Sequence, residues 1–388
     1  MLSLDMLSLD MLYLDNAATS PVRPEVLEAM RPYLTGVFGN PSSHHTAGEA
    51  AASALDDARA RVARVLGMRT GDIVFTAGGT EANNLAVKGI VLGALEAGRR
   101  HLVISPIEHE SILESAAHLQ RFHGVEVTEL PVDRNGRIAP ESLGAAIRDD
   151  TALVSIGHAN NEIGTVQDAT ALAAVARAAR VPLHLDAVQS AGWLPLTGLG
   201  ADAVSIAGHK LGTPKGTGAL AVRGRVPVEP VLHGGGQERG RRSGTENVAG
   251  AVALATALEL AERERDVVAA RVGSSTARFI SLVLGQVAEA ALTGDPVHRL
   301  PATASFTFAG TSGESVLLEL ERRGVISSSG SACAAGSDEP SHVLLACGVA
   351  PGVAQTSVRF TFGREALPAD APERLAALVT ESVRAAGG

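Results

Sequence analysis

The chain has 388 residues, of which 45% are hydrophobic and 19% are charged, and its formal net charge is −9. A chain of this length exceeds one typical hydrophobic core, so we expect a globular protein of two domains. The acidic balance and the lack of a long Lys/Arg run argue against a nucleic-acid surface and favour small substrates.

Cysteine usage and the N-terminus bear on the compartment. Two cysteines, Cys333 and Cys347, are too few for a four-cysteine zinc site or a disulfide framework, which favours a reducing environment. No uninterrupted apolar run is long enough to span a bilayer, and the start lacks the features of a signal peptide. We therefore expect a cytoplasmic protein without membrane contact. The repeated MLSLD before Tyr13 is interpreted as a duplicated start, with a short added structural segment as the alternative.

The first eighty residues contain helices and a candidate anion site. Helices are predicted to begin at Pro24 and to cover 47–66, and a strand is predicted over 72–76. The His44–His45 pair lies in a loop without further ligands at zinc-like spacing, which disfavours a metal there. The strand leads into Ala-Gly-Gly-Thr at 77–80, where glycines and a hydroxyl at a helix N-terminus form an anion cradle. A purely structural turn is the alternative.

A histidine follows the next strand-like run. His109 comes after an apolar stretch at 102–105 and before a helix predicted over 112–121. An imidazole at that edge can stack on an aromatic ring and move protons near neutral pH, whereas a helix-capping histidine is the alternative. Strands and helices continue to alternate through 125–156, which predicts a mostly parallel sheet covered by helices on both faces.

Two later apolar runs, at 183–186 and 202–207, end in polar residues, as buried parallel strands do when they deliver side chains to one edge. Asp186 and Lys210 are therefore expected to face one crevice. An amine and a carboxylate suit pyridoxal phosphate, because the amine forms an imine and the carboxylate keeps the pyridine nitrogen protonated. A surface lysine and an ordinary capping aspartate are the alternative. The nearby Gln189 and His209 favour the cofactor site.

Lysine is scarce in this chain, which narrows the choice of amine. Of 33 basic residues only Lys88, Lys210 and Lys215 are lysines, and arginine cannot form the imine. Lys88 is expected to be exposed on a helix and Lys215 to lie in a turn. Lys210 is the best candidate.

The last third of the chain is predicted to form a linking helix and a smaller α+β domain. A long amphipathic helix is predicted over 248–271, followed by strands over 303–308 and 357–362. A small-residue loop carries Cys333, and such a loop can carry a thiol across a cleft. A buried inert thiol is the alternative and fits Cys347. We predict a large domain over 20–260, and a small domain made of 1–19 and 261–388 with the cysteine loop at about 327–340.

Ten short motifs in this order resemble those of the cysteine desulfurases, pyridoxal-phosphate enzymes of the class V aminotransferase group with fold type I architecture. They are YLDNAATSP (13–21), FGNPS (38–42), GTE (79–81), EH (108–109), NNEIG (160–164), DAVQ (186–189), GHK (208–210), RSGT (242–245), SGSAC (329–333) and SVRF (357–360). The resemblance covers 13 to about 363 and implies a large α/β domain with a mostly parallel seven-stranded sheet, plus a smaller α+β domain. The long small-residue run around Cys333 is similar to that of the branch with an extended loop.

The resemblance also implies a role for each matching residue. Lys210 holds the cofactor and shuttles the Cα proton, Asp186 pairs with the pyridinium, Gln189 bonds the phenolic oxygen and His109 stacks on the ring. The phosphate is held by Gly79, Thr80 and His209, joined by Thr245 of a partner subunit, which implies a homodimer. Arg359 clamps the substrate carboxylate with help from Asn161. No metal is expected.

The implied reaction converts L-cysteine to L-alanine and leaves the sulfur on Cys333 as a persulfide for an acceptor protein, such as an iron–sulfur scaffold. A selenocysteine lyase would share almost every motif. An aminotransferase of the same group would leave the Cys333 loop without a purpose, and a catalytically silent scaffold is disfavoured by the intact Lys210, Asp186 and His109. A nicotinamide enzyme is poorly supported, because no Gly-x-Gly-x-x-Gly turn follows a strand.

Two departures from the family pattern matter. Ala207 stands where the family usually has a serine, so one hydroxyl bond to the phosphate should be missing. The sequence also ends soon after a helix predicted over 373–386, without the longer tail that housekeeping long-loop members use to dock an iron–sulfur scaffold. The acceptor therefore stays open among pathways for iron–sulfur clusters, thiolated tRNA and sulfur-modified DNA.

Overall fold

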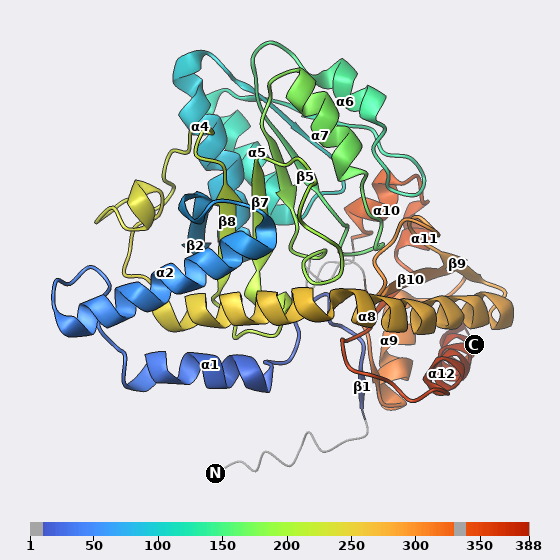
Figure 1. Ribbon diagram of the computed structural model, residues 1–388. Helices are drawn as coiled ribbons and strands as arrows, with labels where there is room; N and C mark the ends of the chain where they lie inside the picture. Colours follow the sequence, from blue (N-terminus) through green and yellow to red (C-terminus); the bar gives the residue numbers. More distant parts are fainter. Residues whose placement is uncertain (1–10, 330–338, 388) are drawn as a thin grey trace.

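A seven-stranded sheet forms the centre of the computed structural model, which describes residues 11–329 and 339–387 (Figure 1). Its strand order is β2-β8-β7-β6-β5-β3-β4. The strands are β2 (Ile73–Thr76), β3 (His101–Ile104), β4 (Glu126–Glu129), β5 (Thr151–Gly157), β6 (Leu183–Asp186), β7 (Ala203–Ala207) and β8 (Gly218–Val222). Only β8 runs antiparallel to its neighbours, which confirms the mostly parallel sheet. The carboxyl ends of β5, β6 and β7 therefore meet at one edge.

Helices cover both faces of this sheet, because successive side chains along each buried strand point to opposite sides. Leu102 and Ile104 of β3 pack in one cluster, whereas Val103 between them packs in another. The helices on the first face are α3 (Gly79–Asn84), the π-helical turn η3 (Leu85–Gly89), α4 (Ile90–Ala94) and α5 (Glu110–His123). On the second face lie α2 (Thr46–Leu66), α6 (Pro140–Ala146), α7 (Ala169–Ala178) and α8 (Val248–Gln286), with α1 (Pro24–Thr35) packed on α8.

The long helix α8 joins two hydrophobic cores. Its first half contributes Leu254, Leu258 and their neighbours to the core under the large sheet, and its second half contributes Val272, Phe279 and Val283 to a second core. The helix was predicted to end at Arg271 and continues to Gln286, because these later apolar residues keep one helical face buried. Within the described residues, α8 alone is long and apolar enough to cross a membrane by composition. The core helix of a globular protein passes the same test, and Val272, Phe279 and Val283 in the apolar second half of α8 are buried here.

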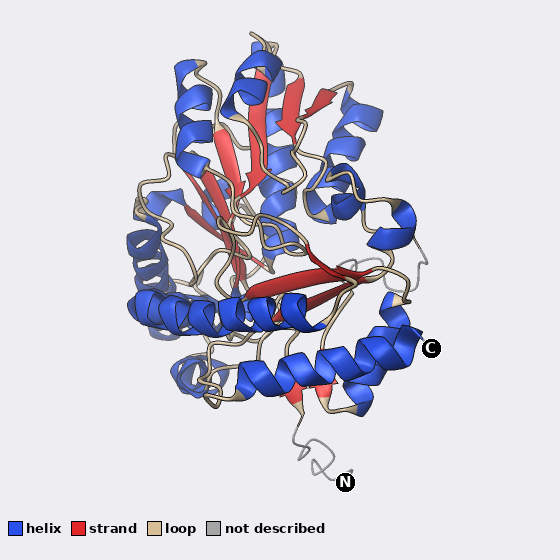
Figure 2. Ribbon diagram, turned by 90° about the vertical axis from the view of Figure 1, so that its right-hand side faces the viewer, coloured by secondary structure: helices blue, strands red, loops and turns tan. Residues whose placement is uncertain are grey.

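The second core lies among short strands and helices beyond the large sheet (Figure 2). A three-stranded antiparallel sheet has the order β12-β10-β9, and β1 pairs in parallel with β11. These elements are β1 (Leu12–Tyr13), β9 (Ala290–Leu292), β10 (Thr303–Phe308), β11 (Val325–Ile326) and β12 (Ser357–Thr361), with helices α9 (Gly313–Arg322), α10 (His342–Ala346), α11 (Pro351–Ala354) and α12 (Ala371–Gly387). The β1–β11 pair brings the N-terminal segment to this smaller α+β unit. The predicted boundary at residue 260 stays a prediction, since α8 runs through it without a break.

Candidate active site

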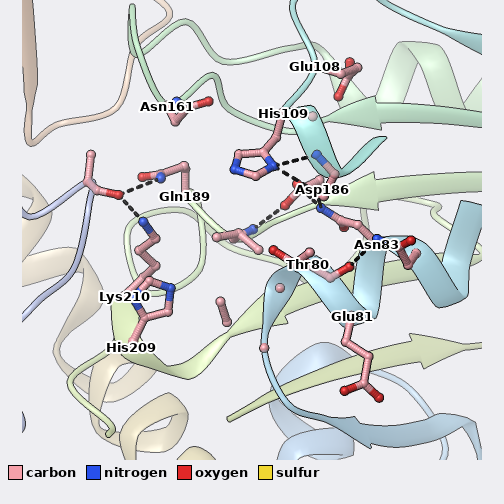
Figure 3. Close-up of a pocket in the computed structure, with 18 of the residues that line it drawn as sticks. Thr80, Glu81, Asn83, Glu108, His109, Asn161, Asp186, Gln189, His209 and Lys210 are labelled. Atoms are coloured by element: carbon pink, nitrogen blue, oxygen red, sulfur yellow. Dashed lines mark hydrogen bonds between the residues drawn. The ribbon is translucent and has the colours of Figure 1, made fainter. Parts of the chain in front are cut away.

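The carboxyl edge of the large sheet opens into a cavity of about 790 Å³ (Figure 3). Nine of the predicted site residues line it: Gly79, Thr80, His109, Asn161, Asp186, Gln189, His209, Lys210 and Arg359. Thr245 does not line the cavity of its own chain and is exposed. Cys333 lies outside the described residues. The structure therefore brings together, at the edge where the strand-end argument placed Asp186 and Lys210, predicted residues that are up to 280 positions apart, from Gly79 to Arg359.

Lys210 reaches the cavity from a 3-10 turn, η5 (Gly208–Lys210), that begins where β7 ends. Its Nζ donates hydrogen bonds to the carbonyls of Ala17 and, at 2.7 Å, Ala18. The Gln189 side chain donates to the same Ala17 carbonyl at 3.1 Å. The segment after β1 therefore forms the wall beside the lysine. Lys210 and Ala17 are 193 residues apart in the sequence, so motif spacing along the chain could not predict this contact.

The other two lysines lie elsewhere. Lys88 sits in η3, away from the residues that line the cavity, and it is half-buried where we expected an exposed side chain. Its neighbours Leu85 and Val87 are buried in the core on that face of the sheet. Lys215 is exposed and lines the cavity. Lys210 stays the best candidate for the amine, because it is bonded to the same Ala17 carbonyl as Gln189 in the cavity that Asp186 also lines.

His209 precedes the lysine and is half-buried. Its Nδ1 lies 3.2 Å from the hydroxyl of Thr19. Burial lowers the pKa of this imidazole to about 4, with the positive charges of Lys210 and Lys215 acting in the same direction. His209 is therefore neutral near pH 7 and offers hydrogen bonding without a charge.

Asp186 ends β6 and is 8% exposed at the floor of the cavity. Its two oxygens have different donors: Oδ1 accepts from the backbone N–H of Val188 at 2.9 Å, and Oδ2 accepts from the side-chain amide of Asn83 at 2.7 Å. These bonds fix the carboxylate in the cavity at the strand end where the sequence placed it. Sequence reasoning missed Asn83, because its position in a helical run carries no sign of a partner 103 residues away.

His109 lies at the start of α5, where it caps the helix and also lines the cavity. Its Nδ1 accepts a hydrogen bond from the backbone N–H of Ser111 at 3.0 Å, so the residue does cap the helix. The same ring lines the cavity near Asp186 (Figure 3). Capping fixes the imidazole at the edge of the site, so the two interpretations are compatible.

The glycine turn at 77–80 has the geometry of an anion cradle. It opens a continuous helical run through α3, η3 and α4, and unpaired backbone N–H groups at a helix start favour phosphate. A Cβ at Gly79 would lie 2.8 Å from Val188 Cγ2 and 3.2 Å from Ala207 Cβ, so a larger residue would require these side chains to shift. The Glu81 carboxylate is occupied by Arg242 at 2.7 Å and by the Ala77 N–H at 2.8 Å.

Arg359 projects from β12 and is 3% exposed. Its guanidinium donates to the Asn161 carbonyl at 2.9 Å and to the Asp15 carboxylate at 2.7 Å. Asp15 therefore balances the buried positive charge, a role that sequence reasoning did not assign. The two residues are 344 positions apart, although both belong to motifs that the sequence singles out.

Glu108 is a second buried carboxyl at the site. It is 3% exposed, and the hydroxyl of Ser105 donates to its Oε1 at 2.5 Å. Burial raises the pKa of Glu108 to about 8, and the nearby charge of Asp186 acts in the same direction. The side chain is therefore largely protonated at neutral pH. Among the described residues, no group of three or more His, Cys, Asp or Glu side chains could hold a metal.

These residues suit pyridoxal phosphate. The cavity has an amine from Lys210, a carboxylate from Asp186, a ring from His109 and a glycine cradle in which a Cβ at Gly79 would crowd Val188 and Ala207. Such a donor set binds an aldehyde, a pyridine nitrogen and a phosphate at once. The fold and this site define the class of pyridoxal-phosphate enzymes with a mostly parallel central sheet.

Comparison with known proteins narrows this class. The family model described as Aminotransferase class-V matches residues 12–371, and the chain belongs to this family. It is 45% identical over 352 residues to a protein of Dictyoglomus turgidum named Cysteine desulfurase IscS, covering 90% of this chain and 89% of that protein. A solved structure described as a NifS-like protein superposes with a TM-score of 0.89 at 33% identity, covering 96% of this chain and 99% of the other. A structure described as SspA in complex with cysteine gives a TM-score of 0.80 at 35% identity, with 92% and 99% covered.

Proposed function

We propose that this protein is a pyridoxal-phosphate-dependent cysteine desulfurase that converts L-cysteine to L-alanine and passes the sulfur to an acceptor protein. The observation that carries the proposal is the convergence of Lys210, Asp186 and the glycine cradle in one cavity, in a chain 45% identical to a cysteine desulfurase. The intact Cys333 separates this activity from that of an ordinary aminotransferase.

The residues of the cavity would hold the cofactor at its imine, its ring and its phosphate. Lys210 would bind it covalently, Asp186 would pair with the ring nitrogen, Gln189 would bond the phenolic oxygen and His109 would stack on the ring. Gly79, Thr80 and His209 would hold the phosphate. When bound, pyridoxal phosphate withdraws electrons from the substrate Cα, which makes cleavage at the neighbouring carbon–sulfur bond accessible.

The substrate is oriented by charge. Arg359, helped by Asn161, binds the carboxylate of cysteine, and the pairing of Arg359 with Asp15 holds the guanidinium in place before substrate arrives. The Lys210 amine moves the proton of Cα. The Cys333 thiolate attacks the substrate sulfur, so that a sulfur–sulfur bond forms as the carbon–sulfur bond breaks. The released carbon takes up a proton, which gives alanine and a persulfide on Cys333.

We also infer a homodimer with shared sites, located in the reducing cytoplasm. Thr245 is exposed and does not line the cavity of its own chain, which supports a position at the cavity of a partner subunit. The acceptor of the sulfur is a second protein, for which an iron–sulfur scaffold is one candidate. The domain division near residue 261 belongs to the same proposal, and it is supported by the passage of α8 from one core to the other.

The test compares the two cysteines of the chain. Alanine and sulfide released from L-cysteine and a thiol reductant are measured for the wild type, Cys333→Ala and Cys347→Ala. We expect release to disappear in Cys333→Ala while the cofactor absorbance is retained. Cys347→Ala is the matched control, because this thiol is buried and burial raises its pKa to about 11. Equal release from the wild type and Cys333→Ala would contradict the persulfide mechanism.

A further inference from the structure

A chain of four side chains runs from the floor of the cavity to the histidine above it (Figure 3). Asn83 Nδ2 lies 2.7 Å from Asp186 Oδ2 and 2.9 Å from Ser111 Oγ. Ser111 Oγ in turn lies 2.9 Å from His109 Nδ1. Asn83 is 2% exposed, Ser111 7% and Asp186 8%, so these contacts are shielded from water. The chain connects α3, α5 and β6, and it joins the two groups expected to contact the cofactor ring.

Counting donors and acceptors fixes the direction of each bond. An asparagine amide has two N–H donors on its nitrogen, and a carboxylate can only accept, so the nitrogen of Asn83 must face Asp186. The second N–H of the same nitrogen points to Ser111 Oγ. The Ser111 hydroxyl therefore accepts from Asn83, and its own hydrogen is left for His109 Nδ1.

His109 Nδ1 is thereby held as an acceptor by two donors from one residue, the backbone N–H of Ser111 at 3.0 Å and its hydroxyl at 2.9 Å. A neutral imidazole carries its proton on one nitrogen only. We propose that Asn83 and Ser111 are positioning residues that hold His109 as the tautomer protonated on Nε2. This inference rests on the proposed function. It deepens that function by making His109 a hydrogen-bond donor toward the cavity and blocking Nδ1 as a proton acceptor.

One unsatisfied atom supports a role beyond packing. Asn83 Oδ1 is buried and has no hydrogen-bond partner. An unpaired buried polar atom lowers stability, and purely structural asparagines normally satisfy both ends of the amide. The hydrogen bonds to Asp186 and Ser111 therefore set the orientation of the Asn83 amide, and they leave its side-chain oxygen without a partner.

The experiment reads the tautomer directly. The ¹⁵N NMR chemical shifts of the imidazole nitrogens are recorded at pH 8 for the holoenzyme labelled with ¹⁵N-histidine. The signals of His109 are assigned as those missing from the spectrum of His109→Gln. We expect a protonated Nε2 and an unprotonated Nδ1 in the wild type. In Asn83→Leu, the Ser111 hydroxyl is free to turn away from the ring, whereas the Ser111 backbone N–H still donates to Nδ1. The Nδ1 resonance should therefore move downfield, toward that of a nitrogen with a single donor, while Nε2 stays protonated. A wild-type His109 protonated on Nδ1 would overturn the proposal.

Kinetics provide a second readout with a matched control. We expect Ser111→Ala to lower kcat by about fivefold, which corresponds to the loss of one hydrogen bond, while KM stays within about twofold of the wild-type value. Ser111→Thr keeps the hydroxyl and should restore kcat. Ser115→Ala is the control, because this hydroxyl lies one turn further along α5, is 1% exposed and donates to the Ser111 carbonyl at 2.7 Å. An equal loss in Ser115→Ala, or an unchanged kcat in Ser111→Ala, would contradict a positioning role. Failure of the wild type to release alanine would instead refute the proposed function and leave the tautomer measurement valid.

Discussion

Ala207 shows how one methyl group bears on cofactor binding. It is the last residue of β7, it lines the cavity, and its Cβ faces the position of Gly79 in the glycine cradle. A serine here would add a hydroxyl beside the phosphate, and a hydrogen bond to a charged group contributes about 1.5–3 kcal/mol. We therefore expect Ala207→Ser to retain the cofactor at least about tenfold more tightly, measured as absorbance remaining after dialysis.

The control for this substitution adds a hydroxyl in a different lining segment of the cavity, the one after β1. Ala18 lines the wall beside Lys210, where its carbonyl accepts from Nζ, and Ala18→Ser should leave cofactor retention unchanged. Equal retention by Ala207→Ser and the wild type would mean that other donors already satisfy the phosphate.

Residue by residue, the sequence predicted the parts of the site that lie at strand ends. Asp186 and Lys210 follow buried apolar runs, and parallel strands place such residues at one edge, so their meeting follows from local pattern. Asn83 and Ser111 come from two helices, where the direction of a side chain depends on helix packing. The Asp15–Arg359 pair joins positions 344 residues apart, and no periodicity encodes such a contact.

At the scale of elements, β6 carries a buried histidine between two serines. His184 Nδ1 lies 2.9 Å from Ser155 Oγ on β5, and Nε2 lies 2.8 Å from Ser205 Oγ on β7. Burial lowers the pKa of this imidazole to about 3, against 6.5 for an unburied histidine. The unfolded chain therefore binds this proton more readily than the native protein, and the stability contributed by the neutral His184 is lost as the pH falls from about 6.5 toward 3.

We expect this histidine alone to lower the free energy of unfolding by about 3 kcal/mol between pH 7 and pH 4. His184→Gln removes the titration, so the decline of stability toward acid should become shallower in urea unfolding at fixed protein concentration. Glu108 provides an internal control with the opposite sign. Its pKa is raised from 4.5 to about 8, so the stability contributed by the protonated carboxyl declines as the pH rises from about 4.5 to 8, and this decline should persist in His184→Gln. An acid slope equal to that of the wild type would contradict the assignment to His184.

The ends of helices were predicted well where a capping or turn residue marks them. They were predicted poorly where the end of the helix depends on tertiary packing. The helix α2 was predicted over 47–66 and is observed as Thr46–Leu66, ending at Gly67 in the left-handed conformation with φ of 62°. The end of α8 was placed fifteen residues too early, at Arg271 instead of Gln286. The second core explains why the helix continues, because Val272, Phe279 and Val283 are buried in it.

At the scale of the molecule, α8 links two cores that hold different parts of the site. Asp186 ends strand β6 of the large sheet and Lys210 lies in the turn after β7, whereas Arg359 belongs to β12 of the smaller unit, and the segment around Ala17 contacts both Lys210 and β12. The site is complete only where the two units meet. Thr245 lies on the loop that precedes α8, and this loop is tied beside the cradle by the Arg242–Glu81 ion pair.

The proposed sharing of Thr245 between subunits makes a prediction for mixed dimers. One subunit carries Lys210→Ala and the other Thr245→Ala, each with a different affinity tag, and the mixed dimer is purified through both tags. If Thr245 serves the partner's cavity, both substitutions fall in the same site, and the second site has wild-type residues throughout. Half of the sites should then retain the cofactor as tightly as the wild type.

The Thr245→Ala homodimer is the reference, and its retention of the cofactor should be weaker because a hydrogen bond to the phosphate is missing. If Thr245 instead served its own chain, the only site with a lysine would lack the threonine, and the mixed dimer would show the weak retention of that homodimer.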